Sequence, residues 1–349
     1  MEENAMRWTM PAETAVQDRV WLSFPVADTS ADYDDAGEHD EARQTWATVA
    51  NAAARFEPVT VLVDPSEVEA AKALLDPAID LLEVPLDDSW LRDSGPTFVH
   101  ADDGSVHAVT WVFNGWGQQE WASWEKDSLL GPFVAERSGA PRVDSSLVNE
   151  GGGIVVDGDG TVVVTETVQL DPSRNPDITK ADVEKELIEK LGVKQVIWLR
   201  RGLKRDSERF GTRGHADILV AFPSPGTALV HSQRDPEHPD FEISLEIREI
   251  LSGSTNAHGE PWRIVELPAP RVLRDSEGFV DYSYINHLVL NGAVLACSFD
   301  DPNDDEALSI LAAEYPDREI VPLDARPIFA RGGGIHCITQ QQPSPRPGA

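Results

Sequence analysis

The sequence IVVDGDGTVVVTE occupies residues 154–166, and it is followed by ITKADVEKELIEKLGV at residues 178–193 and QVIWL at residues 195–199. The first segment consists of β-branched residues interrupted by the turn sequence DGDG, which predicts a two-stranded hairpin. The second has helical spacing, with Thr179 as the expected N-cap and Gly192 as the expected end. The third is a short apolar strand. Together they predict one unit of hairpin, helix and strand.

The same order of elements recurs along the chain. The chain contains three further hairpin patterns, and the four patterns start roughly 60 to 70 residues apart. The others are TFVHADDGSVHAVTW from Thr97, DILVAFPSPGTALVHS from Asp217 and YINHLVLNGAVLACSF from Tyr284. Short apolar strands complete two of these units, RIVEL from Arg263 and EIVPL from Glu319. The unit from Thr97 is a weaker copy, with a helix expected near residues 124–136.

An N-terminal copy completes the series. It begins with VWLSF at residues 20–24, continues through a helical pattern at 39–56 and returns in VTVLV at 59–63, while IHCIT at 335–339 could supply its missing strand. Five units that each bury a face only against their neighbours predict a single radial domain, a five-bladed pseudo-symmetric α/β propeller. We expect it to span residues 1–343, with a flexible tail at 344–349. The alternative is an ordinary α/β protein whose elements alternate by chance.

Composition excludes several classes of function. The 349 residues include 61 acidic and 29 basic ones, a formal charge of −32, which disfavours nucleic acid and anionic membranes as partners. The negative charge would concentrate small cations near the protein. An acidic surface that only aids solubility would give the same composition, so charge alone does not identify a cationic substrate. No signal peptide or membrane span is evident, so we expect a cytoplasmic protein. Two cysteines exclude a disulfide scaffold and a cysteine-rich zinc module.

Reactive side chains stand just before or at the start of the predicted hairpins. They are Asp93, Glu150, His215, Asp217 and Asn286, with Cys337 at the corresponding place in IHCIT. In a radial array, equivalent positions of successive units converge on the centre, so these residues are expected around one cavity near the axis. The acidic run DDPNDDEA at residue 300 lacks the spacing of a calcium loop.

Two of these positions have simpler interpretations when each is taken alone. His215 and Asp217 are two residues apart at an expected strand start, so both side chains would point to one face and could contact one ligand. A histidine beside a carboxylate on the protein surface would have the same spacing. Cys337 follows three glycines, Gly332 to Gly334, which allow a tight turn and a close approach of ligand. A small buried cysteine is an equally good interpretation of Cys337 from composition.

The combination of residues favours chemistry on a guanidinium group. This group is planar and cationic, pairs well with carboxylates, and its carbon accepts attack only from a strong nucleophile. Asp93 and Asp217 would grip its edges, Cys337 would attack, His215 would transfer protons, and Glu150 would orient His215. Trp90 is expected to line the pocket, and Asn286 and Gly334 complete the predicted substrate-binding residues.

The sequence also resembles the agmatine deiminase family, a branch of the pentein or guanidino-group-modifying superfamily related to bacterial peptidylarginine deiminases. The resemblance follows, in order, MPAE at Met10, WLRDSGPTFV at Trp90, FNGWG at Phe113, NEGGGIVVDGDGT at Asn149, ETVQLDPSRNP at Glu166, GHADILVAF at Gly214 and GGGIHCITQQQP at Gly332. It implies the pentein fold, no cofactor, and hydrolysis of agmatine to N-carbamoylputrescine and ammonia. It places the nucleophile at Cys337, the acid and base at His215, and the guanidinium contacts at Asp93 and Asp217, and it carries over Glu150 as a further site residue.

Three departures from the family pattern leave the substrate open. Ile218 stands where the family usually has asparagine, Gly334 stands in GGGIHC where it usually has GGNIHC, and TAVQDRV at 14–20 lacks a histidine usual after MPAE. Deimination of free arginine, of peptidyl arginine or of another substituted guanidine is therefore an alternative. A binder of guanidines or polyamines without turnover is a third hypothesis. The sequence is also compatible with a homo-oligomer.

Overall fold

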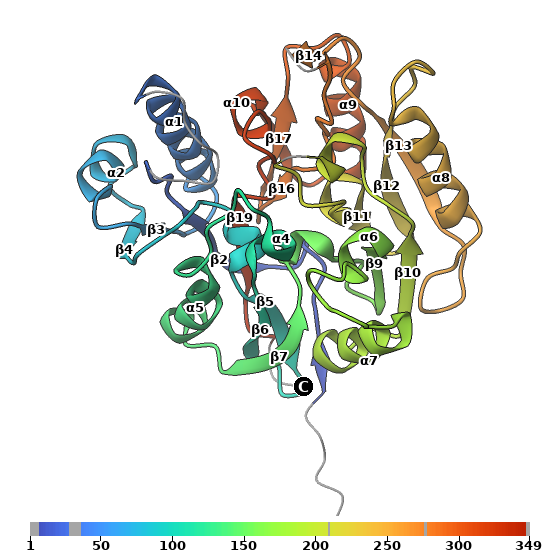
Figure 1. Cartoon of the computed structure of the whole chain (residues 1–349), viewed down its shortest axis with the longest axis horizontal. Coiled ribbons are helices and arrows are strands. Elements are labelled where there is room, and N and C mark those ends of the chain that lie inside the picture. The colour runs from blue at the N-terminus through green and yellow to red at the C-terminus, as the bar shows by residue number, and fades with distance from the viewer. Residues whose placement is uncertain (1–6, 28–35, 209, 276–277, 347–349) are drawn as a thin grey trace, which may run out of the picture.

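The computed structural model describes residues 7–27, 36–208, 210–275 and 278–346. Within these residues the strands form five sheets of three or four strands and one two-stranded ribbon. Figure 1 shows the strands toward the inside of the molecule and the longer helices around its periphery. The chain therefore has a mixed α/β fold built from several small sheets rather than from one continuous sheet.

Three units have the predicted order of hairpin, helix and strand. The first contains β8 (Val155–Val156), β9 (Thr161–Thr165), α7 (Lys180–Leu191) and β10 (Gln195–Leu199). The second contains β11 (Val220–Ser224), β12 (Thr227–Ser232), α8 (Phe241–Ser252) and β13 (Arg263–Pro268). The third contains β16 (Leu288–Val289), β17 (Ala293–Ser298), α9 (Asp304–Glu314) and β18 (Glu319–Asp324).

Each of these units makes a mixed sheet with one topology. The two hairpin strands pair antiparallel, and the strand after the helix pairs parallel to the second hairpin strand. A short turn can join only antiparallel neighbours, whereas a helical connection is long enough to bring the chain back for a parallel strand. The order of elements in the sequence thus sets the topology of each sheet.

Helix α7 begins and ends at the predicted residues. The Thr179 side chain accepts a hydrogen bond from the Asp182 backbone N–H, and the Asp182 side chain bonds the Thr179 backbone in return. At the other end Gly192 has φ +69°, and a Cβ there would lie 1.7 Å from the Trp8 carbonyl oxygen. Only glycine fits this conformation and this close approach, so the helix stops there.

The unit from Thr97 is also present. It contains β5 (Thr97–Ala101), β6 (Val106–Val112), α5 (Leu130–Ser138) and β7 (Arg142–Val148), and β1 (Trp8–Thr9) pairs with β5 as a fourth strand. The helix predicted near residues 124–136 begins later, after a 3₁₀ turn at Asp127–Leu129. Pro132 explains this start, because proline fits the first turn of a helix but disrupts its interior.

The remaining sheet joins the two ends of the chain in the order β19-β2-β3-β4. Its elements are β2 (Gln17–Ser23), α1 (Ala36–Ala53), β3 (Val59–Val63), α2 (Val68–Leu74), β4 (Asp80–Glu83) and β19 (Thr339–Pro343). The C-terminal segment therefore supplies the missing strand. The pairing starts only at Thr339, opposite Leu22, so the prediction that IHCIT forms this strand is wrong. Cys337 lies in the turn that precedes it.

Short elements occupy the connections. They are α3 (Leu91–Ser94), α4 (Gly115–Gln118), α6 (Glu166–Gln169), α10 (Arg326–Phe329), β14 (Arg274–Asp275), β15 (Gly278–Phe279), and 3₁₀ turns at Gly151–Gly153, Arg205–Ser207 and Ala216–Ile218. His215 and Asp217 consequently lie in a turn, and the expectation that they share one face of a strand is wrong.

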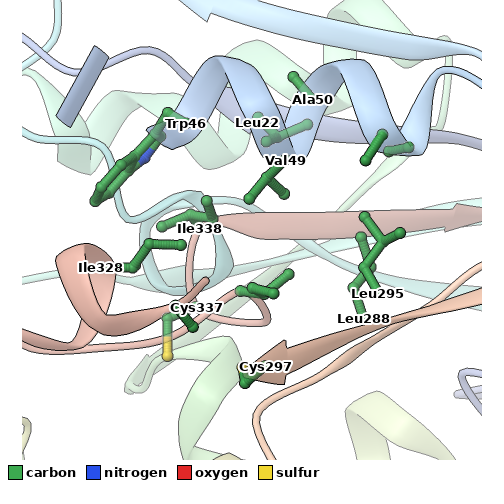
Figure 2. Close-up of a cluster of buried hydrophobic side chains, with 14 of the residues drawn as sticks. Leu22, Trp46, Val49, Ala50, Leu288, Leu295, Cys297, Ile328, Cys337 and Ile338 are labelled. Carbon is green, nitrogen blue, oxygen red and sulfur yellow. The ribbon is translucent and has the colours of Figure 1, made fainter. Parts of the chain in front are cut away.

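The largest group of buried apolar side chains extends from α1 to the C-terminal turn. Figure 2 shows Trp46 and Val49 of α1 above Ile328 and Ile338, with Cys337 at the margin of the group. The sulfur of Cys337 is directed away from Ile338. The core therefore holds the backbone of the turn while the thiol faces out of the apolar cluster.

The predicted tail is attached to the fold in the part that the structure describes. Ser344 N donates to the Val16 carbonyl oxygen, and Arg346 N donates to the Gly104 carbonyl oxygen, each at 2.9 Å. The prediction of a flexible tail is thus corrected for residues 344–346, and residues 347–349 lie outside the described ranges. No helix in the described ranges is both long and apolar enough to cross a membrane.

Candidate active site

The predicted reactive residues occupy equivalent places in the five sheets. Each precedes the first strand of a hairpin or the strand that replaces it: Asp93 on α3 before β5, Glu150 before β8, His215 and Asp217 before β11, Asn286 before β16, and Cys337 before β19. All are less than a tenth exposed. The structure therefore confirms their common position, although the elements that carry them are turns rather than strand starts.

Four of these side chains meet at one point. Cys337 Sγ lies 3.5 Å from Asp217 Oδ2, and His215 Nδ1 lies 3.7 Å from Asp93 Oδ1. The backbone of Gly152 reaches this point, since a Cβ added there would be within 3.1 Å of His215, Asp93 and Asp217 atoms. Gly152 N also donates to Asp93 Oδ1 at 3.1 Å. A residue larger than glycine at position 152 would fill the space between these three side chains.

A narrow pocket leads from the surface to Cys337. Its walls are Asp88, Trp90, Asp93, Trp116, Trp121, Phe210, Thr212, Arg331 and Gly332. Trp90 therefore lines the pocket as predicted. The pocket combines aromatic walls with the carboxylates of Asp88 and Asp93, which suits a ligand with an apolar stem and cationic groups.

Glu150 orients His215 from the side opposite the pocket. Its Oε2 lies 3.2 Å from His215 Nε2, and its Oε1 accepts a hydrogen bond from Arg174 Nε at 2.9 Å. Burial opposes the ionisation of Glu150, but Arg174 and His215 outweigh burial and lower its pKa to about 2. The ring is thereby fixed with Nδ1 toward Asp93, 3.7 Å from its Oδ1, which makes Nδ1 the atom available for proton transfer.

Arg174 is a buried cation on which this arrangement depends. It pairs with Glu150 and with Asp171 Oδ2 at 3.0 Å, and its side chain is 0% exposed. We expect Arg174→Met to lower the free energy of unfolding by about 3 to 5 kcal/mol, because the buried Glu150 loses its arginine partner and Asp171 keeps only its pair with Arg213. Urea denaturation measures this change. The half-exposed pair of Arg234 and Glu306 provides the control, since Arg234→Met should cost less than about 1 kcal/mol. Equal losses in the two variants would contradict the expectation.

The two aspartates have different electrostatic surroundings. Burial, opposed in part by His215, raises the pKa of Asp93 to about 6, and the nearby charges of Asp217 and Glu150 act in the same direction as burial. Burial also acts to raise the pKa of Asp217, but His336 and His215 outweigh it and lower that pKa. Asp217 is therefore the more firmly ionised of the pair, and Asp93 is the one that titrates near neutral pH.

In the unliganded site the pKa values of both the acid and the nucleophile are raised. Burial lowers the pKa of His215, but Asp93 and Glu150 outweigh burial and raise it to about 9. Burial and the charges of Asp217 and Asp93 raise the pKa of the Cys337 thiol well above its usual value. In the unliganded site the imidazole is thus protonated at neutral pH and the sulfur is held as a thiol.

Asn286 and Gly334 support the nucleophile instead of lining the pocket. Asn286 Nδ2 donates to Cys337 Sγ at 3.2 Å, and its Oδ1 accepts from His336 N at 3.0 Å. A Cβ on Gly334 would lie 2.5 Å from Asn286 Oδ1, so glycine lets the backbone at position 334 approach the Asn286 side chain closely. The glycine that faces the sulfur is Gly333, where a Cβ would lie 3.1 Å from Cys337 Sγ.

Four functional residues were not identified from the sequence. Trp116 Nε1 donates to Asp93 Oδ2 at 2.9 Å, Arg174 holds Glu150, and His336 joins Asp217 to Glu13. Each lies inside a segment that was already singled out: FNGWG, ETVQLDPSRNP, IHCIT and MPAE. Their position inside these motifs was the available signal in the sequence. It did not identify their roles, because each side chain acts on a partner that is distant in sequence. Among the described residues, no group of His, Cys, Asp and Glu has the arrangement of a metal site.

Comparison with known proteins gives the family. A family model described as Porphyromonas-type peptidyl-arginine deiminase matches residues 9–343. The chain belongs to this family. The match covers all five sheets and every residue of the cluster around Cys337, so family membership applies to the site as well as to the fold.

Relatives and a solved structure cover nearly the whole chain. A Streptomyces coelicolor protein, provisionally named agmatine deiminase, is 52% identical over 339 residues, which is 97% of this chain and 99% of the relative. The agmatine deiminase of Pseudomonas syringae pv. syringae is 39% identical over 359 residues, covering 96% and 95%. The solved structure of agmatine deiminase from Enterococcus faecalis matches with a TM-score of 0.89 and 30% identity, covering 98% and 97%. These similarities agree with the mixed α/β fold described above.

Proposed function

We propose that this chain is an agmatine deiminase, which hydrolyses agmatine to N-carbamoylputrescine and ammonia. The observation that carries the proposal is the meeting of a thiol, an imidazole and two carboxylates at the end of a buried pocket. Within the described residues, Asp217 Oδ1 and His215 Nδ1 are buried without a hydrogen-bond partner. An unpaired buried polar atom is costly, so two of them on the residues of this cluster favour a polar ligand bound there.

A guanidinium group would satisfy both carboxylates. Its fork of N–H groups pairs bidentately with carboxylate oxygens, and its positive charge compensates Asp93 and Asp217 in a buried site. The same charge also acts on the nucleophile, because these two carboxylates are the groups that hold the Cys337 thiol protonated. Substrate binding therefore favours formation of the thiolate next to the carbon that it attacks.

The reaction then needs only this chain's side chains and water. The Cys337 thiol gives its proton to water in the pocket, and Sγ forms a bond to the guanidinium carbon as the C=N electron pair moves to nitrogen, giving a neutral tetrahedral adduct. His215 Nδ1 donates its proton to one –NH₂ group, which leaves as ammonia, and the carbon remains bound to sulfur as a thiouronium cation. Neutral His215 then takes a proton from water as the water oxygen attacks. The C–S bond breaks, and the hydroxyl proton of this second adduct passes to the departing sulfur, which releases the ureido product and restores the Cys337 thiol.

The walls of the pocket suit the rest of agmatine. Trp90, Trp121 and Phe210 line it above Cys337 and would pack against the four methylene groups. Asp88 also lines the pocket and would attract the terminal ammonium group of agmatine. Free arginine would instead bring a carboxylate toward Asp88. This comparison of charges supports agmatine over arginine as the substrate.

We also propose that the five sheets close into a five-bladed propeller within one domain. Supporting contacts join neighbouring sheets around the molecule, including β19 with β5, β8 with β11, and α9 with β13. The common position of the reactive residues before the inner strands agrees with a pseudo-fivefold axis through the site. A cytoplasmic location and a possible homo-oligomer remain part of the proposal, as expected from the sequence.

A pH prediction follows from the state of Asp93. Since Asp93 must be ionised to bind guanidinium, kcat/KM should fall about tenfold per pH unit below its pKa of about 6. The Trp116 hydrogen bond lowers this pKa, so Trp116→Phe should move the acid limb to higher pH. Initial rates measured from pH 4.5 to 8 in ~0.5-unit steps would show the shift. Trp121→Phe is the matched control, because Trp121 Nε1 donates to Gln119 and not to Asp93. An acid limb in Trp116→Phe that coincides with the control would contradict the assignment.

A panel of guanidines tests the proposed function. The purified protein would be incubated separately with agmatine, arginine, an arginyl peptide and methylguanidine, and ammonia and ureido product would be measured. We expect agmatine to have the highest kcat/KM. A higher value for arginine or the peptide would reject agmatine as the substrate, and binding without ammonia release would favour a non-catalytic binder.

A further inference from the structure

His336 forms a link between Asp217 and the N-terminal segment, on the side of Asp217 away from the unpaired oxygen. Its Nδ1 lies 2.7 Å from Asp217 Oδ2 and its Nε2 lies 2.6 Å from Glu13 Oε1. The ring is 5% exposed, and its backbone N–H is held by Asn286 Oδ1. A histidine whose two ring nitrogens both face carboxylate oxygens must donate from both, so this ring is an imidazolium.

We propose that His336 is a positioning residue for the substrate guanidinium. By donating to Asp217 Oδ2, the oxygen that lies 3.5 Å from Cys337 Sγ, it fixes this carboxylate beside the nucleophile, and Oδ1, which has no hydrogen-bond partner among the described residues, is left for the cation. Glu13 holds the other nitrogen of the ring. This inference rests on the proposed function only for the identity of the substrate. A carboxylate with one oxygen bonded in this way cannot turn to satisfy itself elsewhere, so it is preorganised for a bidentate or single-edge contact with a planar cation.

The surrounding charges support this role. Burial and Arg92 act against the charged ring, but Glu13 and Asp217 outweigh them and raise the pKa of His336. Partial burial acts to raise the pKa of Glu13, but His336 and Arg92 lower it to about 2. The hydrogen bond from His336 is in turn the largest influence that lowers the pKa of Asp217. Asp217 is thereby kept ionised for the cation while Asp93 titrates.

Two substitutions at His336 separate positioning from mere packing. The amide nitrogen of asparagine lies near the place of Nδ1 and keeps a donor to Asp217, whereas that of glutamine lies near the place of Nε2 and keeps only the donor to Glu13. We expect His336→Gln to lower kcat/KM for agmatine by about 10- to 100-fold, mainly through a higher KM, which is the effect of losing a charge-assisted hydrogen bond. His336→Asn should recover most of this loss.

A histidine outside the link provides the control. His287 is also buried, but its ring nitrogens contact the Tyr284 carbonyl oxygen and the Tyr315 hydroxyl. His287→Asn should lower the melting temperature without raising KM. If His336→Gln keeps the wild-type KM, or if His336→Asn loses as much as His336→Gln, the proposal is overturned.

A second variant keeps the test decisive if the His336 variants do not fold. Glu13 is partly exposed, with 32% of its side chain accessible, so Glu13→Ala should fold and still release the anchor of the ring. We expect a several-fold weaker Kd for agmatine when Glu13→Ala is added to Cys337→Ala, measured by calorimetry. An unchanged Kd would overturn the proposal. Because this titration needs no turnover, its result is separate from the panel assay: absence of ureido product from the wild-type protein would reject the proposed function instead.

Discussion

Cys337→Ala is expected to lower kcat for ureido-product formation by roughly 10⁴-fold or more, because no other group can form the bond to the guanidinium carbon. The side chain is 6% exposed, and the sulfur faces Asp217 and Asn286 at the margin of the core. The substitution removes only the sulfur at the margin of the core, together with its contact with Asp217. The melting temperature should therefore change little. Agmatine should still bind, since both aspartates remain.

Cys297 is the matched control for this experiment. It is completely buried, its Sγ contacts the Asn286 carbonyl oxygen at 3.1 Å, and burial raises its pKa to about 12. Cys297→Ala should therefore lose some stability and keep turnover within a few-fold. Mass spectrometry of rapidly quenched wild-type protein should detect an adduct with the mass of agmatine minus ammonia on Cys337. Full activity in Cys337→Ala would end the covalent mechanism.

His215→Asn is expected to have the second largest effect, a loss of about 10²- to 10⁴-fold in kcat, because both the departure of ammonia and the attack of water need a proton carrier at Nδ1. The amide is too short to contact Glu150 at the place of Nε2, and it does not exchange protons near neutral pH. Binding should be partly preserved, since Asp93 and Asp217 make the contacts to the cation.

The separation of kcat from binding makes this expectation testable. Agmatine binding to His215→Asn can be measured by calorimetry, and the first turnover can be followed by quenched-flow detection of ammonia. We expect a Kd within about tenfold of that of Cys337→Ala together with a slow first release of ammonia. A wild-type rate of ammonia release would show that another group is the acid.

The same geometry explains why His215 can act as an acid in a site rich in negative charge. Asp93 and Glu150 raise its pKa to about 9, so the ring carries the proton throughout the neutral range and loses it as pH rises through that value. Asp93 needs the opposite state and is ionised above about pH 6. The two requirements overlap between about pH 6 and 9, which is where kcat/KM should be highest.

Much of the fold was accessible from local patterns. The hairpin, helix and strand order of each unit is visible because turn residues such as Gly192 require conformations that few other residues adopt, and because strands and helices place apolar residues at different periods. The details that failed depended on neighbours in space. The strand after Cys337 begins at Thr339 because pairing with β2 starts opposite Leu22, and nothing in IHCIT itself indicates that register.

The candidate site was predicted less completely than the fold. Cys337, His215, Asp93 and Asp217 could be found because they recur at one place in a repeating unit, and repetition is a property of the sequence. His336, Glu13, Arg174 and Trp116 could not be found in this way, since each acts through a partner between 20 and 330 residues away. Gly334 and Asn286 were correctly associated with the site but support the nucleophile from behind.

The linear order of residues was thus enough to predict the repeating α/β unit and the set of groups that could attack and protonate a guanidinium. Tertiary structure alone decided which ring nitrogen of His215 faces the pocket, which aspartate stays ionised, and which glycine borders the sulfur. The physical reason is that these properties depend on distances of a few ångströms between side chains from different sheets, where burial strengthens every charge interaction, and such distances have no signature along the chain.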